Sequence, residues 1–340
     1  MMPWRLHRKF YKIKIFNMRF VYIPSQGASW RERLEYYFST DTAQPIDVSV
    51  EIIDATSLEV IGSMRLYNVT KGRVNIAPYI ASQVSLVPVR NNGKVSVYPS
   101  PSAIAVIVRI NGVESESRLF FRSKFNPAVS EMLTEHRTSD EVEFGDVVRL
   151  TIHAKEALRL TVSYNGVAGM SPYDYSVRTN GFPMEVTLPT RDLKVGAEMV
   201  VTARYEDGTL QSVRYKIVPR GSSSCRLLWY NPNGGIETYT FCHRIRLGYG
   251  VDVRELVECD GKPSRLVDGR VEYRLCSGSD SSANLERVAR LLLSPVVYKE
   301  RGVEFMEVTV DSREVAFDSK GQLHVVSLDI SEKWKGGELW

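Results

Sequence analysis

Apolar and polar residues alternate along most of the chain. In the first third, runs such as IDVSVEII (46–53) and SLEVIGSMRLYNV (57–69) carry apolar side chains at every second position, which is the period of a half-buried strand. The stretches Asn91-Asn92-Gly93 and Asn111-Gly112 separate further runs of this kind. Asn and Gly tolerate the positive φ that tight hairpin turns require. We therefore expect an N-terminal β domain over residues 18–125.

The pattern changes briefly at residues 126–140. In FNPAVSEMLTEHRTSD (125–140), Pro127 suits a first helical position, and Val129, Met132 and Leu133 recur at helical spacing. This segment predicts a linker with one short helix. Alternation resumes over 141–220, a length typical of an immunoglobulin-like β-sandwich.

A flexible joint, Gly221-Ser-Ser-Ser224, is expected before a third region, residues 225–340. This last region mixes strands with one helix near 282–294, where Leu285, Val288 and Leu292 line one face and Pro295 ends the pattern. The predicted fold class is mainly β: tandem immunoglobulin-like β-sandwich domains followed by a C-terminal β-rich α+β domain with one helix.

The net charge of +4 changes this picture little, because the excess is confined to one end. Residues 1–17 contain five basic residues and no acid, so residues 18–340 carry −1. That balance argues against a nucleic-acid partner, which requires a surplus of cations to neutralise phosphates. The basic leader 1–17 is either an arm that binds a polyanion or a neighbouring subunit, or the product of a wrongly assigned start, in which case translation begins at Met18.

The sequence predicts neither a secretory signal nor a membrane span. Lys12 and Lys14 interrupt YKIKIF, so we expect no secretory signal peptide. We also expect no membrane span, because no later stretch approaches about 18 uncharged apolar residues. Synthesis in the cytoplasm is the expectation.

The four cysteines recur every 17 residues, at Cys225, Cys242, Cys259 and Cys276. Zinc sites pair their ligands closely, as in C-x2-4-C, and this spacing does not. We therefore expect semi-buried thiols, with a disulfide or a metal site as alternatives.

The most distinctive stretch is CRLLWYNPNGGIETYTF (225–241). Asn231-Pro232-Asn233-Gly234 has the residues of a type I turn, and Gly235 offers a second position with positive φ. The flanks are expected to pair as a hairpin in which Trp229 and Tyr239 stack across the strands. The alternative is a sugar-binding platform of Trp229, Tyr230 and Tyr239 with Glu237 as its carboxylate.

No spacing along the chain indicates catalysis, so we predict no catalytic, cofactor-binding or metal-binding residues and no enzymatic activity. The histidines lack metal-binding spacing, and no phosphate loop or nucleophile elbow is present. A glycosidase needs two converging carboxylates, and the sequence does not place any pair. The acids near predicted turns are Glu141, Glu143, Asp146, Glu255, Glu258 and Asp260.

Two segments carry a family resemblance. CRLLWYNPNGGIETYTF resembles a W-x-N-x-x-GG-x-[ED]-x-[YW]-x-F element of β-rich, tail-associated prophage proteins from anaerobic gut bacteria. LLLSPVVYKERGVEF, within 291–330, is similar to the segment that closes the same proteins. The resemblance covers the C-terminal third. Its structural hairpin signature falls on Trp229, Asn231, Gly234, Gly235, Glu237, Tyr239 and Phe241.

The resemblance implies a non-enzymatic virion component, a tail-associated structural or adaptor protein that forms a homo-oligomer and binds other virion proteins. It implies no cofactor and no catalytic residues. The alternative is a β-sandwich protein that binds a glycan or a cell surface.

Overall fold

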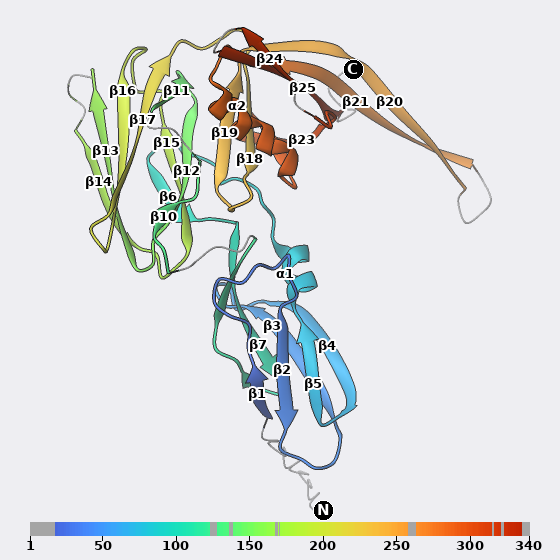
Figure 1. Cartoon of the computed structure of the whole chain (residues 1–340). Helices are drawn as coiled ribbons and strands as arrows, with labels where there is room; N and C mark the ends of the chain where they lie inside the picture. The colour runs from blue at the N-terminus through green and yellow to red at the C-terminus, as the bar shows by residue number, and fades with distance from the viewer. Residues whose placement is uncertain are drawn as a thin grey trace, which may run out of the picture. The chain divides into compact units, whose positions relative to one another are not determined.

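The structure is a computed structural model that describes residues 18–122, 128–135, 139–166, 169, 171–257, 263–314, 316–320 and 323–334. The described chain is mainly β (Figure 1), as the sequence predicts. It divides into two compact units. Unit 1 comprises residues 1–83 and 104–120, and unit 2 comprises residues 84–103 and 121–340.

Unit 1 contains two antiparallel sheets. The first has the order β1-β2-β5, and the second has the order β4-β3-β7-β8 with β9 also paired to β7. Their bounds are β1 Met18–Tyr22, β2 Glu35–Thr40, β3 Ile46–Asp54, β4 Val60–Val69, β5 Lys71–Asn75, β7 Ala103–Ile110, β8 Val113–Glu114 and β9 Arg118–Phe121.

Both sheets of unit 1 contribute buried side chains to its core, among them Phe38 of β2 and Ile52 of β3. The predicted hairpin turn Asn111-Gly112 joins β7 to β8, and both of its residues adopt positive φ. The sequence reading missed one helix, α1 (Ala77–Gln83). Its Tyr79 ring lies against Gly62 of β4, where a Cβ atom would approach the ring to 2.2 Å.

The first half of unit 2 is the predicted β-sandwich. One sheet has the order β10-β12-β15-β6, and the other has the order β11-β17-β16-β13-β14. The bounds are β6 Ser96–Pro99, β10 Glu131–Met132, β11 Ser139–Glu143, β12 Val147–His153, β13 Ala157–Asn165, β14 Tyr173–Arg178, β15 Pro183–Pro189, β16 Glu198–Tyr205 and β17 Leu210–Val218. Leu150, Val186 and Val201 belong to its continuous apolar core.

The domain assignment of one segment differs from the prediction. Strand β6 was assigned to the N-terminal domain, yet it pairs with β15 from Met184↔Pro99 to Thr187↔Ser96 and completes a sheet of the sandwich. The buried Asn91 amide secures this segment, since its Nδ2 donates to Thr187 Oγ1 at 2.8 Å. Residues 84–103 thus fold with unit 2, although the sequence placed them in the N-terminal domain, whereas the later division between the units, after residue 120, lies close to the expected boundary at 125.

The predicted helix in the linker 126–140 is also corrected. Glu131 and Met132 form the short strand β10, which pairs with β12 instead of continuing a helix. Within this linker, residues 126–127 and 136–138 lie outside the described part of the chain. Pairing with an existing sheet edge satisfies backbone groups that a one-turn helix would leave open.

The C-terminal half of unit 2 is one sheet of eight strands, ordered β19-β18-β22-β23-β25-β21-β20, with β24 also paired to β25. The bounds are β18 Cys225–Tyr230, β19 Ile236–Phe241, β20 His243–Val257, β21 Pro263–Cys276, β22 Val297–Arg301, β23 Glu304–Val310, β24 Ala316–Lys320 and β25 Leu323–Trp334. Figure 1 shows β20 and β21 extending from this sheet as a long hairpin.

The predicted C-terminal helix is present as α2 (Ser282–Ala289), continued by a 3-10 turn, Arg290–Leu293. Ser281 caps it, because its hydroxyl accepts from the Asn284 amide. Val288 and Leu291 pack with Leu227 and Trp229 of β18 in the core of this half. The opposite face of β18 is also buried, through Leu228 and Tyr230.

Candidate functional site

The stretch 225–241 forms the predicted hairpin of β18 and β19, paired from Cys225↔Phe241 to Tyr230↔Ile236. The turn begins at Asn231, whose carbonyl accepts from Gly234 N at 3.0 Å, and Gly234 takes φ +82°. This is a type I turn followed by a left-handed glycine, a common hairpin connection. The Asn231 Oδ1 also accepts from the Asn233 and Gly235 amides, both at 2.9 Å.

Gly235 has a different role from the one expected. We assigned it a positive φ, and its backbone is not in that region. A Cβ atom there would instead lie 2.2 Å from the Leu133 carbonyl oxygen and 2.7 Å from Thr134 N. The residue is therefore required for close approach of the 133–135 segment to the hairpin.

The aromatic residues of the hairpin do not form a sugar platform. Trp229 and Tyr230 are fully buried. The register places Glu237 opposite Trp229 and Leu227 opposite Tyr239, so the expected cross-strand partner of Trp229 is wrong. Tyr239 instead meets Phe241 edge-on, with 5.0 Å between ring centroids.

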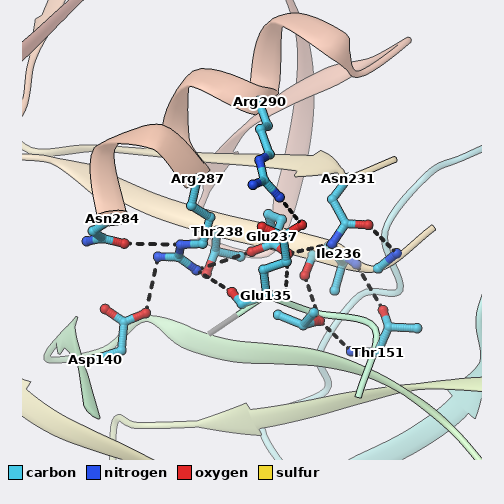
Figure 2. A network of polar contacts seen from close by, with 12 residues as sticks. Glu135, Asp140, Thr151, Asn231, Ile236, Glu237, Thr238, Asn284, Arg287 and Arg290 are labelled. Carbon is cyan, nitrogen blue, oxygen red and sulfur yellow. Dashed lines mark hydrogen bonds and ion pairs between the residues drawn. The ribbon is translucent and has the colours of Figure 1, made fainter. Parts of the chain in front are cut away.

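Glu237 is the centre of a buried polar network (Figure 2). Its Oε2 accepts from Arg287 Nη1 of α2 at 3.1 Å, and its Oε1 accepts from the Glu135 amide at 2.6 Å and from Asn231 Nδ2 at 2.7 Å. Burial raises the pKa of the Glu237 carboxyl to about 7, and the Arg287 charge and these donors act in the opposite direction.

Arg287 joins three segments through one guanidinium group. Besides Glu237, it donates to Glu135 O at 3.0 Å, to Asp140 Oδ2 at 3.2 Å and to Asn284 Oδ1 at 3.1 Å. Figure 2 shows these partners converging from α2, the hairpin and the sandwich side. A planar guanidinium with several donors suits such a junction.

Hydrogen bonds next to this network also connect the hairpin to the sandwich. The Thr151 hydroxyl of β12 accepts from Ile236 N at 2.9 Å, and Thr134 Oγ1 donates to Ile236 O at 2.8 Å. Asn231 Nδ2 additionally donates to Leu133 O at 2.8 Å. The signature residues Asn231, Gly235 and Glu237 thus hold the sandwich against the C-terminal sheet.

A second buried cluster reinforces this junction. Glu300 of β22 pairs with Arg149 of β12 at 3.2 Å and with Arg226 of β18 at 3.1 Å. Arg149 also pairs with Glu185 at 3.3 Å, and Arg226 with Asp146 at 3.2 Å. All five side chains are less than a tenth exposed. Each buried charge therefore has an opposite charge beside it, which is the condition for tolerating burial.

The Glu143 carboxylate forms hydrogen bonds with both ends of the predicted flexible joint at 221–224. Glu143 Oε1 accepts from Gly221 N at 3.2 Å, and Oε2 accepts from Ser224 Oγ at 2.7 Å. Of the acids singled out in the sequence, Glu143 and Asp146 are thus structural, and Glu141 is exposed. The Glu255 side chain and residues 258 and 260 lie outside the described part.

The other candidate groups are dispersed. His153 is buried in β12, where its Nδ1 lies 2.8 Å from Val129 O and burial lowers its pKa. Cys225, Cys242 and Cys276 are free thiols, and burial raises the pKa of Cys225 to about 11. Cys259 lies outside the described residues. Within the described ranges, no three His, Cys, Asp or Glu side chains cluster as metal ligands would.

A cavity of about 400 Å³ lies beside the junction, lined in part by Asp140, Tyr215, Arg226, Tyr239 and Arg287. The three arginines that line it, Arg149, Arg226 and Arg287, are the ones already paired with carboxylates of the junction. Sequence reading named Glu237 and missed Arg149, Glu185, Arg226, Arg287 and Glu300. The sequence signal that could have identified such residues is a charged side chain at an inward-facing position of an otherwise apolar strand, as at Arg226 in CRLLWY.

Comparisons with known proteins identify no family. Neither the known protein families nor the curated proteins gave a match. Solved structures that resemble the chain include a trypsin-activated alpha-2-macroglobulin from Escherichia coli, at 8% identity over 92% of this chain, with a TM-score of 0.22. This chain covers 23% of the macroglobulin.

Two further similar structures are CBD12 from CALX1.2 and a 1.5-MDa bacterial ice-binding adhesin. CBD12 shares 8% identity over 54% of this chain and 93% of its own, with a TM-score of 0.18. The adhesin shares 10% identity over 76% of this chain and 87% of its own, with a TM-score of 0.17. Its own strands and sheets make the chain a mainly β protein that contains a β-sandwich. No helix in the described ranges is long and apolar enough to cross a membrane.

Proposed function

We propose that this chain is a non-enzymatic structural or adaptor component of a phage virion, associated with the tail. In this role it joins copies of itself and other virion proteins through rigid β-rich surfaces. The attribution to a tail rests on the sequence resemblance at 225–241 and 291–330. The structure supports a mechanical role for those residues.

The observation that carries the proposal is that the signature residues of the hairpin themselves contact the sandwich and helix α2. Asn231 and Glu237 bind the 133–135 backbone and Arg287, and Gly235 allows the close approach of that backbone. The residues that define the motif thus form the contact between the β-sandwich and the C-terminal sheet. A component that transmits force or fixes the spacing of its neighbours requires a rigid contact of this kind, since a loosely joined pair of domains would bend.

The buried carboxylates are consistent with this assignment. Glu185, Glu237 and Glu300 are each paired with arginine in the junction, where they neutralise buried cations. Their arrangement is that of an ion-pair network, which fixes geometry at a desolvation cost.

The test is to find the chain in particles. Phage particles from an induced culture of the source bacterium are purified on a density gradient and analysed by peptide mass spectrometry. We expect peptides of this chain in constant ratio to other virion proteins across the gradient. Absence from particles that contain a complete tail would overturn the proposal. A glycan array with the purified chain tests the cell-surface alternative independently.

A further inference from the structure

The cavity beside the junction has both apolar and polar walls. Its volume is about 400 Å³, which is within the range of small-molecule sites. The sandwich contributes the apolar side chains of Val142, Val148 and Val218, and the tyrosines Tyr215 and Tyr239 also line it. The cavity can therefore hold a ligand that combines an apolar chain with a polar group.

The Tyr215 hydroxyl is a polar group of this cavity without a hydrogen-bond partner among the described residues. Tyr215 is 5% exposed, and the register of β11 with β17 places it opposite Asp140. The charges of Asp140, Arg226 and Arg287, which line the same cavity, act on this hydroxyl. Buried hydroxyls are normally hydrogen-bonded, and an unpaired one costs free energy. The Tyr215 hydroxyl therefore indicates that a polar group of a ligand binds beside it.

The charge balance of the cavity favours a cation. Its lining includes the carboxylates of Asp140, Glu143 and Asp280. Glu143 accepts hydrogen bonds from Gly221 N and Ser224 Oγ, which are neutral donors. The three arginines of the lining already pair with four carboxylates outside it, those of Asp146, Glu185, Glu237 and Glu300. The carboxylates of the lining thus leave a surplus of negative charge, and a partly enclosed cavity with such a surplus attracts cations.

The side chains around the cavity suit an organic cation better than a metal ion. Within the described ranges, no three His, Cys, Asp or Glu side chains lie close enough together to hold a metal. An alkylammonium group has three N–H donors that can reach separate acceptors. Its alkyl chain can pack along valine and tyrosine side chains as the stem of a lysine does, and aromatic rings attract the charge itself.

We propose that this cavity binds an alkylammonium group, whose N–H donors are accepted by the Tyr215 hydroxyl oxygen and by the carboxylates of Asp140 and Asp280. Such a group occurs on free diamines and on the lysine side chains of proteins. Because the sandwich and the C-terminal half of unit 2 both line the cavity, a bound ligand stabilises the contact between them. The inference goes beyond the proposed function, since it holds whether or not the chain belongs to a virion.

The test measures binding to the full chain by isothermal titration calorimetry at low ionic strength, where screening is weak. Cadaverine represents a free diamine, and Nα-acetyl-lysine methylamide represents a lysine side chain. We expect at least one of these probes to bind with a dissociation constant of about 1 mM or tighter. Pentanol has a similar alkyl chain without the charge, and it should bind at least about tenfold more weakly than the better amine.

Two substitutions locate the site. Tyr215→Phe removes only the hydroxyl and Asp280→Asn removes only a charge, so each should raise the dissociation constant about tenfold, the effect of losing a hydrogen bond to a charged group. Tyr205→Phe is the matched control, because Tyr205 is equally buried in the sandwich but lies outside the lining, and its hydroxyl donates to Gln211 at 2.6 Å. It should change the dissociation constant less than about twofold.

The folded state of Tyr215→Phe is checked by thermal unfolding. Its midpoint should not fall, because the substitution removes a hydroxyl that has no partner. Binding of cadaverine alone assigns the site to free amines, and binding of the lysine amide assigns it to a protein side chain; both results support the inference. It is overturned if neither amine binds at about 10 mM, if pentanol binds as tightly, or if Tyr215→Phe and Asp280→Asn leave binding unchanged. These outcomes are independent of whether the chain is found in phage particles.

Discussion

Glu237 on β19 and Arg287 on α2 form an ion pair in which the carboxylate is 1% exposed and the guanidinium 9% exposed. Removing one partner of a buried pair leaves the other charge without compensation, which typically costs about 3–5 kcal/mol. We therefore expect Arg287→Ala to lower the free energy of unfolding of unit 2 by that amount. Urea denaturation followed by Trp fluorescence measures it, since Trp229 is buried nearby.

The matched control is Arg290→Ala, three residues further along the same polypeptide segment. Arg290 pairs with Glu135, but its side chain is 46% exposed. Exposed pairs contribute about 0–1 kcal/mol, so this variant should unfold almost as the unaltered protein does. Equal losses in the two variants would show that the network does not stabilise the junction in the way described.

The contact of Gly235 with Leu133 gives a second prediction. A Cβ atom at residue 235 would meet backbone atoms 2.2–2.7 Å away, and backbone cannot rotate aside as a side chain does. Gly235→Ala should therefore destabilise unit 2 by several kcal/mol, the upper range for single substitutions. Gly248→Ala is the control, because no atom lies within 4 Å of its added Cβ, and we expect a change within about 1 kcal/mol. Thermal unfolding of both variants distinguishes steric clash from a general effect of alanine.

The strands were predictable because alternation is a local property. IDVSVEII became β3, whose fully buried positions largely alternate along the strand, since one buried face imposes a period of two whatever the partner strand is. The turn at 231–234 was predictable for the same reason: Pro232 and Gly234 restrict the backbone within a few residues.

Contacts between segments that lie far apart in the sequence were not predictable in this way. Nothing within GKVSVYPS (93–100) states that β6 pairs with β15, about 90 residues later. The close approach at Gly235 is likewise invisible in the sequence, because a glycine needed for space and one needed for positive φ look the same. Strand β20 was not individually predicted either, because Gly248 and Gly250 interrupt its alternating run.

Glu143 gives a third prediction, at the connection between the sandwich and the C-terminal sheet. Its carboxylate holds Gly221 N and Ser224 Oγ, and hydrogen bonds to a charged group contribute about 1.5–3 kcal/mol. Glu143→Ala should release residues 220–224 and speed tryptic cleavage after Arg220 about tenfold or more. Glu141→Ala, at the exposed neighbouring position two residues earlier, should leave the rate unchanged. Peptide mapping over a digestion time course reports the cleavage site, and an unchanged rate in Glu143→Ala would mean that the joint is held by other contacts.

The last prediction concerns pH. Burial raises the pKa of both Glu185 and Glu237 from 4.5 to about 7. Between these values the folded protein holds more protons than the unfolded chain, so these groups stabilise the fold fully below pH 4.5 and progressively less as pH rises through 7. His153 acts oppositely: burial lowers its pKa, so its contribution grows as pH rises toward 6.5.

Comparison with Glu237→Gln separates these effects, because the variant retains Glu185 and His153. Each unit of pKa shift corresponds to about 1.4 kcal/mol. We therefore expect the unaltered protein to lose a few kcal/mol more than the variant between pH 5 and pH 7.5. Urea denaturation at half-unit pH intervals measures both profiles. Parallel profiles would mean that Arg287 keeps Glu237 ionised throughout this range, and the junction would then be insensitive to pH.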